Sequence, residues 1–162
     1  MSYRPDQRQV YSRIMTPAGW LQGTLHVPRA SKLVPYLNAQ PDFLRMTDVS
    51  FLGRPNRIGF MSVQRRGMSI LVPDAEEQDL AIVDESTLPQ RVFVLLEAGV
   101  LAGSIRLRQG VRLSDFFSKQ HGFILLHDCS LQVGEAGQPR VEERHPAVLV
   151  NSQCVVAVSE AE

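Results

Sequence analysis

The chain has 162 residues, 44% of them hydrophobic and 21% charged, with a formal net charge of zero. This profile is typical of one medium or two very small globular domains, and no apolar run approaches the ~18 residues that a membrane helix needs. The polar start, MSYRPDQRQ, lacks the apolar segment of a secretory signal, so we expect a cytoplasmic protein that does not contact membranes.

The first predicted elements are two strands and a helical turn. QVYSRIM (residues 9–15) reads as a strand that ends in the turn TPAG, and LQGTLHV (residues 21–27) alternates apolar and polar residues as a half-buried strand does. In the segment SKLVPYLNAQ, Leu33, Tyr36 and Leu37 follow the i, i+3, i+4 spacing of an apolar helix face. We expect one helical turn that closes the end of a small barrel.

Two more strands follow, and the second is interrupted by VQRRG (residues 63–67). DFLRMTDVSFLG (residues 42–53) is apolar and ends on glycine, and FMSVQRRGMSILV (residues 60–72) holds two apolar runs. Arg66 and Gly67 can form a strand-to-strand turn that stacks on a base or holds phosphate, with Arg54 and Arg57 extending the positive surface. The alternative is a hairpin turn in which Gly67 has a positive φ and Arg65 and Arg66 are solvated.

An acidic segment separates the two halves of the chain. Residues 1–73 hold ten basic and three acidic residues, a net charge of +7, whereas residues 74–89 hold six acidic and no basic residues. A strongly basic half attracts phosphates, as in RNA, or an acidic partner protein. The alternative is that the acidic segment folds back and neutralises it. Its apolar run, residues 80–83, can add a strand or pack between the halves.

The second half repeats the first. Residues 18–50 align without gaps to residues 98–130, with nine of 33 pairs identical, and residues 60–72 resemble residues 147–159 after a loop seven residues longer. RVFVLLE (residues 91–97) takes the place of the first strand. The repeat predicts a tandem duplication with domains at residues 8–73 and 90–159, joined by the acidic linker at residues 74–89. Each unit alone has a thin core, so the two gain by burying faces or edges against one another.

The order of these signals resembles the Sm-like (LSm/Hfq) family of small β-barrels. The first family motif is resembled by Gly19, Gly23, Leu25, Asn38, Phe43, Leu44 and Asp48, and the second by Val63, Arg66, Gly67, Ile70 and Val72. The resemblance implies a mainly β fold of two tandem, strongly bent, five-stranded Sm-like or SH3-like barrels, each with one short helical turn. The family's aspartate before the Asn is absent, and Ser118 and Gln153-Cys154 replace Asn38 and Arg66-Gly67 in the second copy. A nucleobase pocket of the family type is therefore expected in the first copy only.

Several polar residues have a structural and a functional interpretation. Asn38 can bond a base edge, cap the helical turn or sit in an Asx-type turn. Tyr36 can stack on a base or belong to the core, and Trp20 can contact a partner. Asp48 and Asp128 occupy matching positions, which favours a structural role such as bonding the backbone of a turn.

The sequence contains no recognisable catalytic or metal-binding pattern. The four histidines are scattered, and Cys129 and Cys154 lack metal-type spacing and lie in apolar runs, which predicts buried free thiols. We therefore expect a protein without catalytic activity, metal or cofactor.

Binding and assembly are the functions that these features favour. Members of the resembled family form rings by pairing strand edges, which implies a homo-oligomer here, either a dimer or a trimer with six barrels. We expect an oligomeric scaffold or a regulatory interaction module. The alternative is that the basic first barrel binds single-stranded RNA or another polyanion through Asn38, Arg54, Arg57, Arg65, Arg66 and Gly67.

Overall fold

The computed structural model describes residues 6–51, 54, 56–133 and 141–161. The first unit contains β1 (Gln7–Thr16), β2 (Gly19–Pro28), α1 (Leu33–Ala39), β3 (Phe43–Phe51), β4 (Arg57–Gln64), the 3-10 turn η1 (Arg65–Gly67) and β5 (Ile70–Pro73). The second unit repeats this order with β6 (Thr87–Leu96), β7 (Gly99–Arg108), α2 (Leu113–Lys119), β8 (Phe123–Val133), β9 (Val141–Asn151), η2 (Ser152–Cys154) and β10 (Val155–Glu160). The predicted repeat of strands and helical turns is confirmed.

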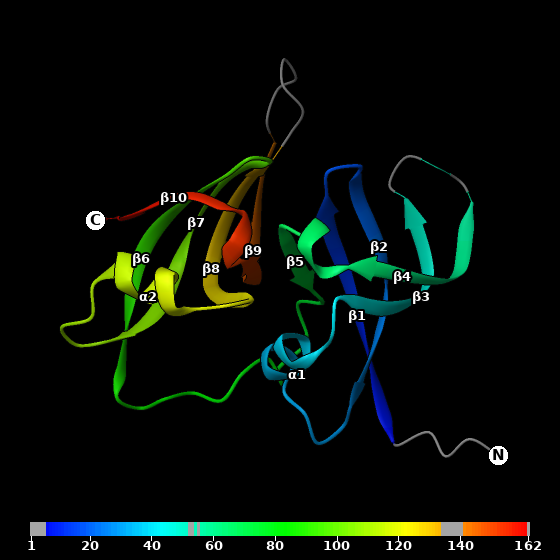
Figure 1. Ribbon diagram of the computed structural model, residues 1–162, viewed down its shortest axis with the longest axis horizontal. Helices are drawn as coiled ribbons and strands as arrows, with labels where there is room; N and C mark the ends of the chain where they lie inside the picture. The colour runs from blue at the N-terminus through cyan, green and yellow to red at the C-terminus, as the bar shows by residue number, and fades with distance from the viewer. Residues whose placement is uncertain (1–5, 52–53, 55, 134–140, 162) are drawn as a thin grey trace.

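The described strands form one antiparallel sheet in the order β10-β6-β7-β8-β9-β5-β1-β2-β3-β4. Each unit supplies five neighbouring strands, with its last strand beside its first (Figure 1). The sheet is not closed, because β4 and β10 stand at its two ends and are not paired with each other. The prediction of a mainly β fold is confirmed, while the division into two separate barrels stays a prediction. Neither seven-residue helix is long enough to cross a membrane.

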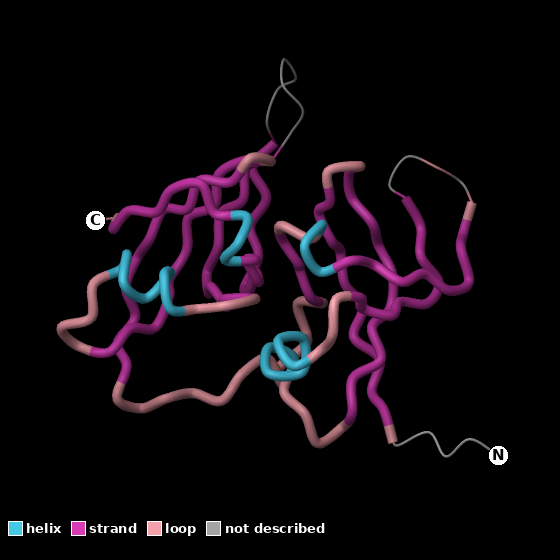
Figure 2. The backbone as a smooth tube through the Cα atoms, in the orientation of Figure 1, coloured by secondary structure: helices cyan, strands magenta, loops and turns pink. Residues whose placement is uncertain are grey.

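The two units are connected by the pairing of β5 with β9, which we call the internal joint. Ile70 lies opposite Val150 and Leu71 opposite Leu149, and the backbone N–H of Asn151 donates to Ser69 O at 2.9 Å. The strand β5 is also paired with β1 on its other side. The tube in Figure 2 shows these strands side by side at the centre of the molecule. The internal joint therefore turns two five-stranded units into one continuous sheet.

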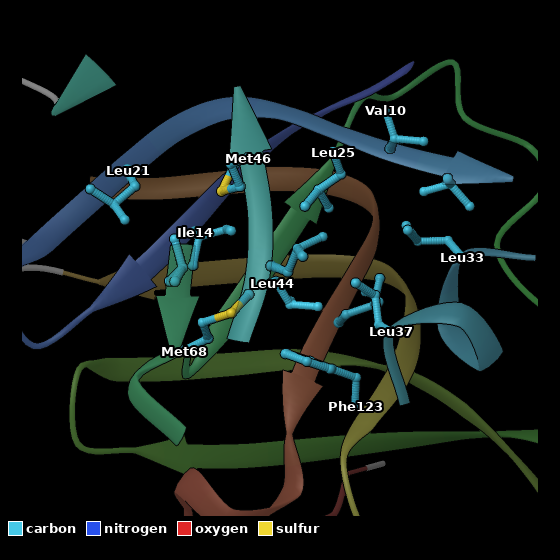
Figure 3. Packing of buried hydrophobic residues seen from close by; sticks show 14 of the residues in the cluster. Val10, Ile14, Leu21, Leu25, Leu33, Leu37, Leu44, Met46, Met68 and Phe123 are labelled. Atoms are coloured by element: carbon cyan, nitrogen blue, oxygen red, sulfur yellow. The ribbon is translucent and has the colours of Figure 1, made fainter. Parts of the chain in front are cut away.

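Side chains from each unit complete the core of the other. The first buried cluster contains Phe123, Ala147 and Leu149 of the second unit among residues of the first. The second cluster contains three residues of the first unit, Met15, Ile70 and Val72. Figure 3 shows Phe123 in the first cluster, with labelled side chains from α1 and β3 around it. Neither unit fills its core with its own residues alone.

The helical turns and the linker lie against these cores. Leu33 and Leu37 of α1 are fully buried, as the apolar spacing predicts. Residues 80–83 of the linker form no strand, and its last three residues, 87–89, belong to β6. The carbonyl oxygens of Asp79 and Leu80 accept hydrogen bonds at 2.8 Å from the first N–H groups of α1, those of Leu33 and Val34. Leu80 is buried in the first cluster, whereas Ile82 and Val83 are exposed, so the predicted packing of this run holds for Leu80 only.

A β-bulge bends each unit at the same position of the repeat. The register shifts at Gly23 between β2 and β3, and at Gly103 between β7 and β8. The residues on the facing strands, Asp48 and Asp128, have φ values of 52° and 50°. Their expected hydrogen bonds to turn backbone are not seen in the described residues. Aspartate occurs there because it tolerates the left-handed region better than bulkier side chains do.

The bulge explains why a glycine must occupy position 103. A Cβ atom there would lie 2.9 Å from Cys129 Sγ and 3.2 Å from His127 O. We expect Gly103→Ala to lower the free energy of unfolding by about 1–3 kcal/mol, as overpacking of a filled core does. The control is Gly67→Ala, where no atom lies within 4 Å, and which we expect to change stability by less than about 1 kcal/mol. Urea denaturation of both variants tests this, and equal effects would contradict the steric explanation.

Candidate functional site

Asn38 lies at the internal joint. Its side-chain Nδ2 donates to Phe123 O at 3.1 Å, and its Oδ1 accepts from the Phe123 N–H at 2.7 Å. The residue at the C-cap of α1 is Gln40, so the prediction that Asn38 caps the helical turn is wrong. The side chain reaches across to the second unit and holds the first residue of β8. A base contact by Asn38 would compete with these two bonds.

The segment Arg65-Arg66-Gly67 forms the single 3-10 turn η1 between β4 and β5. Gly67 is not among the residues with positive φ, so the hairpin interpretation, which needed that conformation, is wrong. Arg65 is half-buried, and its Nη1 donates to the carbonyl oxygen of Gln40 at 2.7 Å. This arginine therefore secures the end of α1, and only Arg66 of the pair is exposed.

The exposed arginines predicted to bind polyanions do not form one cluster. Arg57 is the first residue of β4, whereas Arg66 is the second residue after the end of this strand. An extended strand of this length separates them by roughly 25 Å. Arg54 and Arg57 are near one end of the sheet edge and Arg66 is at the other. Within the described residues, none of the three forms an ion pair, so they present a long basic edge rather than a pocket.

The acidic linker neutralises part of the first unit. Glu77 lies 3.3 Å from Arg8, and Asp79 lies 2.7 Å from Lys32. The hydrogen bond from Lys32 is the main reason that the pKa of Asp79 is lower than usual. The linker thus folds back on basic residues near α1 and β1. It leaves the arginines of β4 and η1 outside these ion pairs.

A polar cluster flanks the internal joint beside Trp20. The guanidinium of Arg13 lies 4.4 Å from the centre of the Trp20 ring, and its Nη1 lies 3.2 Å from Glu143 of the second unit. His145 Nε2 is 2.9 Å from the same carboxylate. Burial raises the pKa of Glu143, but the hydrogen bonds from His145 and Arg13 outweigh it and hold the pKa below its ordinary value. Trp20 is thus half-buried within the chain, where it packs against the second cluster.

The two open edges of the sheet carry exposed apolar side chains that sequence reasoning missed. On the side of β4, Phe43 is 52% exposed and Phe60 is 57% exposed. Their counterparts in the repeat, Phe123 and Ala147, are 2% and 6% exposed because the first unit covers them. On the side of β10, Leu95 of β6 is 40% exposed, whereas its counterpart in the repeat, Met15 of β1, is buried at the internal joint. The edges therefore expose positions that are buried where the units meet.

A shallow cavity of about 480 Å³ lies beside the exposed rings of the first unit. It is lined by Gln7, His26, Tyr36, Gln40, Pro41, Phe43, Arg45, Thr47 and Phe60. Burial raises the pKa of Tyr36, and His26 Nε2 lies 2.7 Å from Thr47 Oγ1. Aromatic rings beside an arginine can stack on bases or pack against a partner's apolar residues.

Cys129 lies within β8, and Cys154 lies in η2 directly before β10. Cys129 is buried and Cys154 half-buried, and neither forms a disulfide. Burial raises the pKa of Cys129 to about 12, which makes its thiol unreactive near neutral pH. In the part of the chain that the structure describes, no group of His, Cys, Asp and Glu is arranged to hold a metal ion.

Comparisons with protein-family models, with curated proteins and with solved structures find no match to this chain. The assignment of function therefore depends on the geometry of the joint and of the open edges.

The role of Asn38 at the joint can be tested by its removal. Asn38→Ala deletes both hydrogen bonds to Phe123, and we expect the free energy of unfolding to fall by about 1–3 kcal/mol. The matched control is Ser118→Ala at the same repeat position in α2, where the side chain is exposed and the expected change is within about 0.5 kcal/mol. Unchanged stability in the Asn38 variant would show that its bonds do not support the joint.

Proposed function

We propose that this protein is a non-catalytic binding and assembly protein whose chains join through their strand edges. The observation that carries the proposal is the internal joint, in which β5 of one unit pairs with β9 of the next. By the repeat, β10 is the counterpart of β5, and β4 is the counterpart of β9. These counterparts are the two strands left at the ends of the sheet. A second chain can therefore repeat between molecules the contact that already exists within one.

Such a contact is heterologous, because it joins two different edges. Repeated contacts of this kind close into a ring or continue as a filament, and soluble oligomers favour closure. Two chains would give four units and three chains six, the two sizes expected from the sequence. We also propose that each unit is a small, strongly bent barrel of Sm-like type. The neighbouring unit would complete this barrel. The support is the five-strand order that both units share and the core residues they exchange.

The composition of the edges supports assembly. Soluble proteins blunt unpaired edges with proline, lysine or a covering loop, because bare backbone groups recruit other strands. Neither β4 (RIGFMSVQ) nor β10 (VVAVSE) contains proline or lysine, and their charged residues, Arg57 and Glu160, lie at the ends of the strands. Both strands combine apolar residues with unpaired backbone on one side. Pairing with another chain would satisfy both features.

The proposal predicts an oligomer in dilute solution. Light scattering coupled to size exclusion should give a mass of about two or three times the 18.1 kDa of one chain, and the mass should persist in high salt because apolar contacts and backbone hydrogen bonds are weakly screened. A stable monomer across the accessible concentrations would contradict the proposal.

RNA or polyanion binding is the second candidate, favoured by the unpaired arginines. Arg45 stands among exposed aromatic rings, and Arg54, Arg57 and Arg66 line the adjacent edge and turn. Guanidinium groups would attract phosphates while rings stack on bases. Arg65 and Asn38 are occupied by structural hydrogen bonds, so they would take little part.

This second candidate predicts nucleic acid that is retained at low salt and removed at high salt. The ratio of absorbance at 260 nm to that at 280 nm should fall after a high-salt wash, because counterion release weakens phosphate binding steeply. Arg66→Ala should weaken binding of a single-stranded oligonucleotide and reduce its salt dependence. Arg29→Ala is the control, since Arg29 is paired with Asp6 at 2.8 Å. Equal loss in both variants would indicate non-specific attraction only.

A further inference from the structure

We infer that Phe43 is the anchor by which one chain docks on the second unit of another copy of this chain. The inference deepens the proposed assembly and rests on it, since it names the partner and the residue that enters it. It is drawn from the environment of Phe123, which occupies the same position in the repeat and is already docked within the chain.

Phe123 shows what this position does when a neighbouring unit is present. It is the first residue of β8, and its ring is buried in the cluster of the first unit near Leu37 and Met68 (Figure 3). Both of those residues are fully buried. Burial of a phenylalanine removes a large apolar area from water, so this ring is a major part of the internal joint. Large aromatic side chains are the usual energetic anchors of interfaces.

Phe43 has the same local setting without the neighbour. It is the first residue of β3 and lies opposite Gln64 of β4, as Phe123 lies opposite Asn151 of β9. It is nevertheless about half exposed, because β4 is at the end of the sheet. Isolated exposed phenylalanines need no explanation, but this one is the copy of a buried anchor.

The receiving surface is present at the other end of the chain. The counterparts of Leu37 and Met68 are Phe117 and Val155, and both are only half-buried beside the second cluster. The counterpart of the fully buried Ile70 is Ala157 of β10, which is exposed. The positions of Leu37 and Met68, which share the first cluster with Phe123, are therefore partly open in the second unit, and Ala157 is uncovered at the strand position where Ile70 is buried in the joint. A second copy would cover them with Phe43.

The surface next to Phe43 fits a protein better than a small ligand. The outer face of β8 and β9, which corresponds to that of β3 and β4, is covered in this structure by α1 and the first cluster. The shallow cavity beside Phe43 is the place where α2 of a second copy would lie, as α1 lies on β8. Binding of RNA at this cavity and docking of a second copy would exclude each other.

The inference is tested with two variants that block opposite ends of the chain. Phe43→Asp places a charge at the anchor, and Ala157→Asp places one on β10 at the position that corresponds to buried Ile70. Both residues are exposed, so each variant should fold. Each alone should have the mass of one chain by light scattering. An equimolar mixture should form a complex of one copy of each variant, because one intact edge remains on each partner.

The control is Leu88→Asp, which puts the same charge on an exposed apolar residue outside the joint and should keep the mass of the wild type. Assembly of the Phe43→Asp variant as large as that of the wild type would overturn the inference and leave the proposed assembly intact. Self-association of either variant, or no complex in the mixture, would likewise overturn it. A monomeric wild type would remove the proposed assembly itself.

Discussion

The pairing of β5 with β9 is the contact on which the rest of this structure depends. Only two residue pairs form the ladder, Ile70 with Val150 and Leu71 with Leu149. A ladder so short contributes little by itself. It is effective because it aligns side chains that cross between the units: Met15, Ile70 and Val72 enter the second cluster, and Phe123, Ala147 and Leu149 enter the first. The polar groups of Asn38, Arg13 and Glu143 fix the same alignment from the sides.

This exchange of core residues explains why a duplicated chain is stable where one unit would be marginal. A unit of about 70 residues buries a smaller fraction of its surface than a larger domain does, and its core is thin. Here each unit uses the outer face of its neighbour as one wall of its own core. The cost of the arrangement is that the first unit lacks a neighbour on the side of β4 and the second lacks one on the side of β10. The exposed residues Phe43, Phe60 and Leu95 mark those two sides.

The sequence predicted the elements well, because strand alternation, turn glycines and the i, i+3, i+4 spacing of Leu33 and Leu37 are local signals. It did not predict the internal joint, since which distant edges pair has no local signature. For the same reason neither the base contact nor the helix cap considered for Asn38 includes its partner Phe123, which lies 85 residues away. Of the two interpretations of VQRRG, the hairpin turn needed a positive φ at Gly67, whereas the observed 3-10 turn accommodates this glycine without it. The repeat did mark the two anchor positions, because a phenylalanine occupies both position 43 and position 123. Only Phe123 is buried.

The joint within one chain and the proposed joint between two chains would be held by different interactions. Within the chain, Asn38 bonds Phe123 and Arg13 bonds Glu143. At the corresponding positions of the other end, Ser118 bonds its own helix at Ser114, and Phe93 replaces Arg13. A joint between chains would therefore rest on apolar contact and strand pairing, without these side-chain bonds, and it would lack the covalent linker. Because effective concentration favours contacts within a chain, the pair of units would remain whole whenever the assembly separates. Separation of the chains would then expose the edge of β4 together with its arginines.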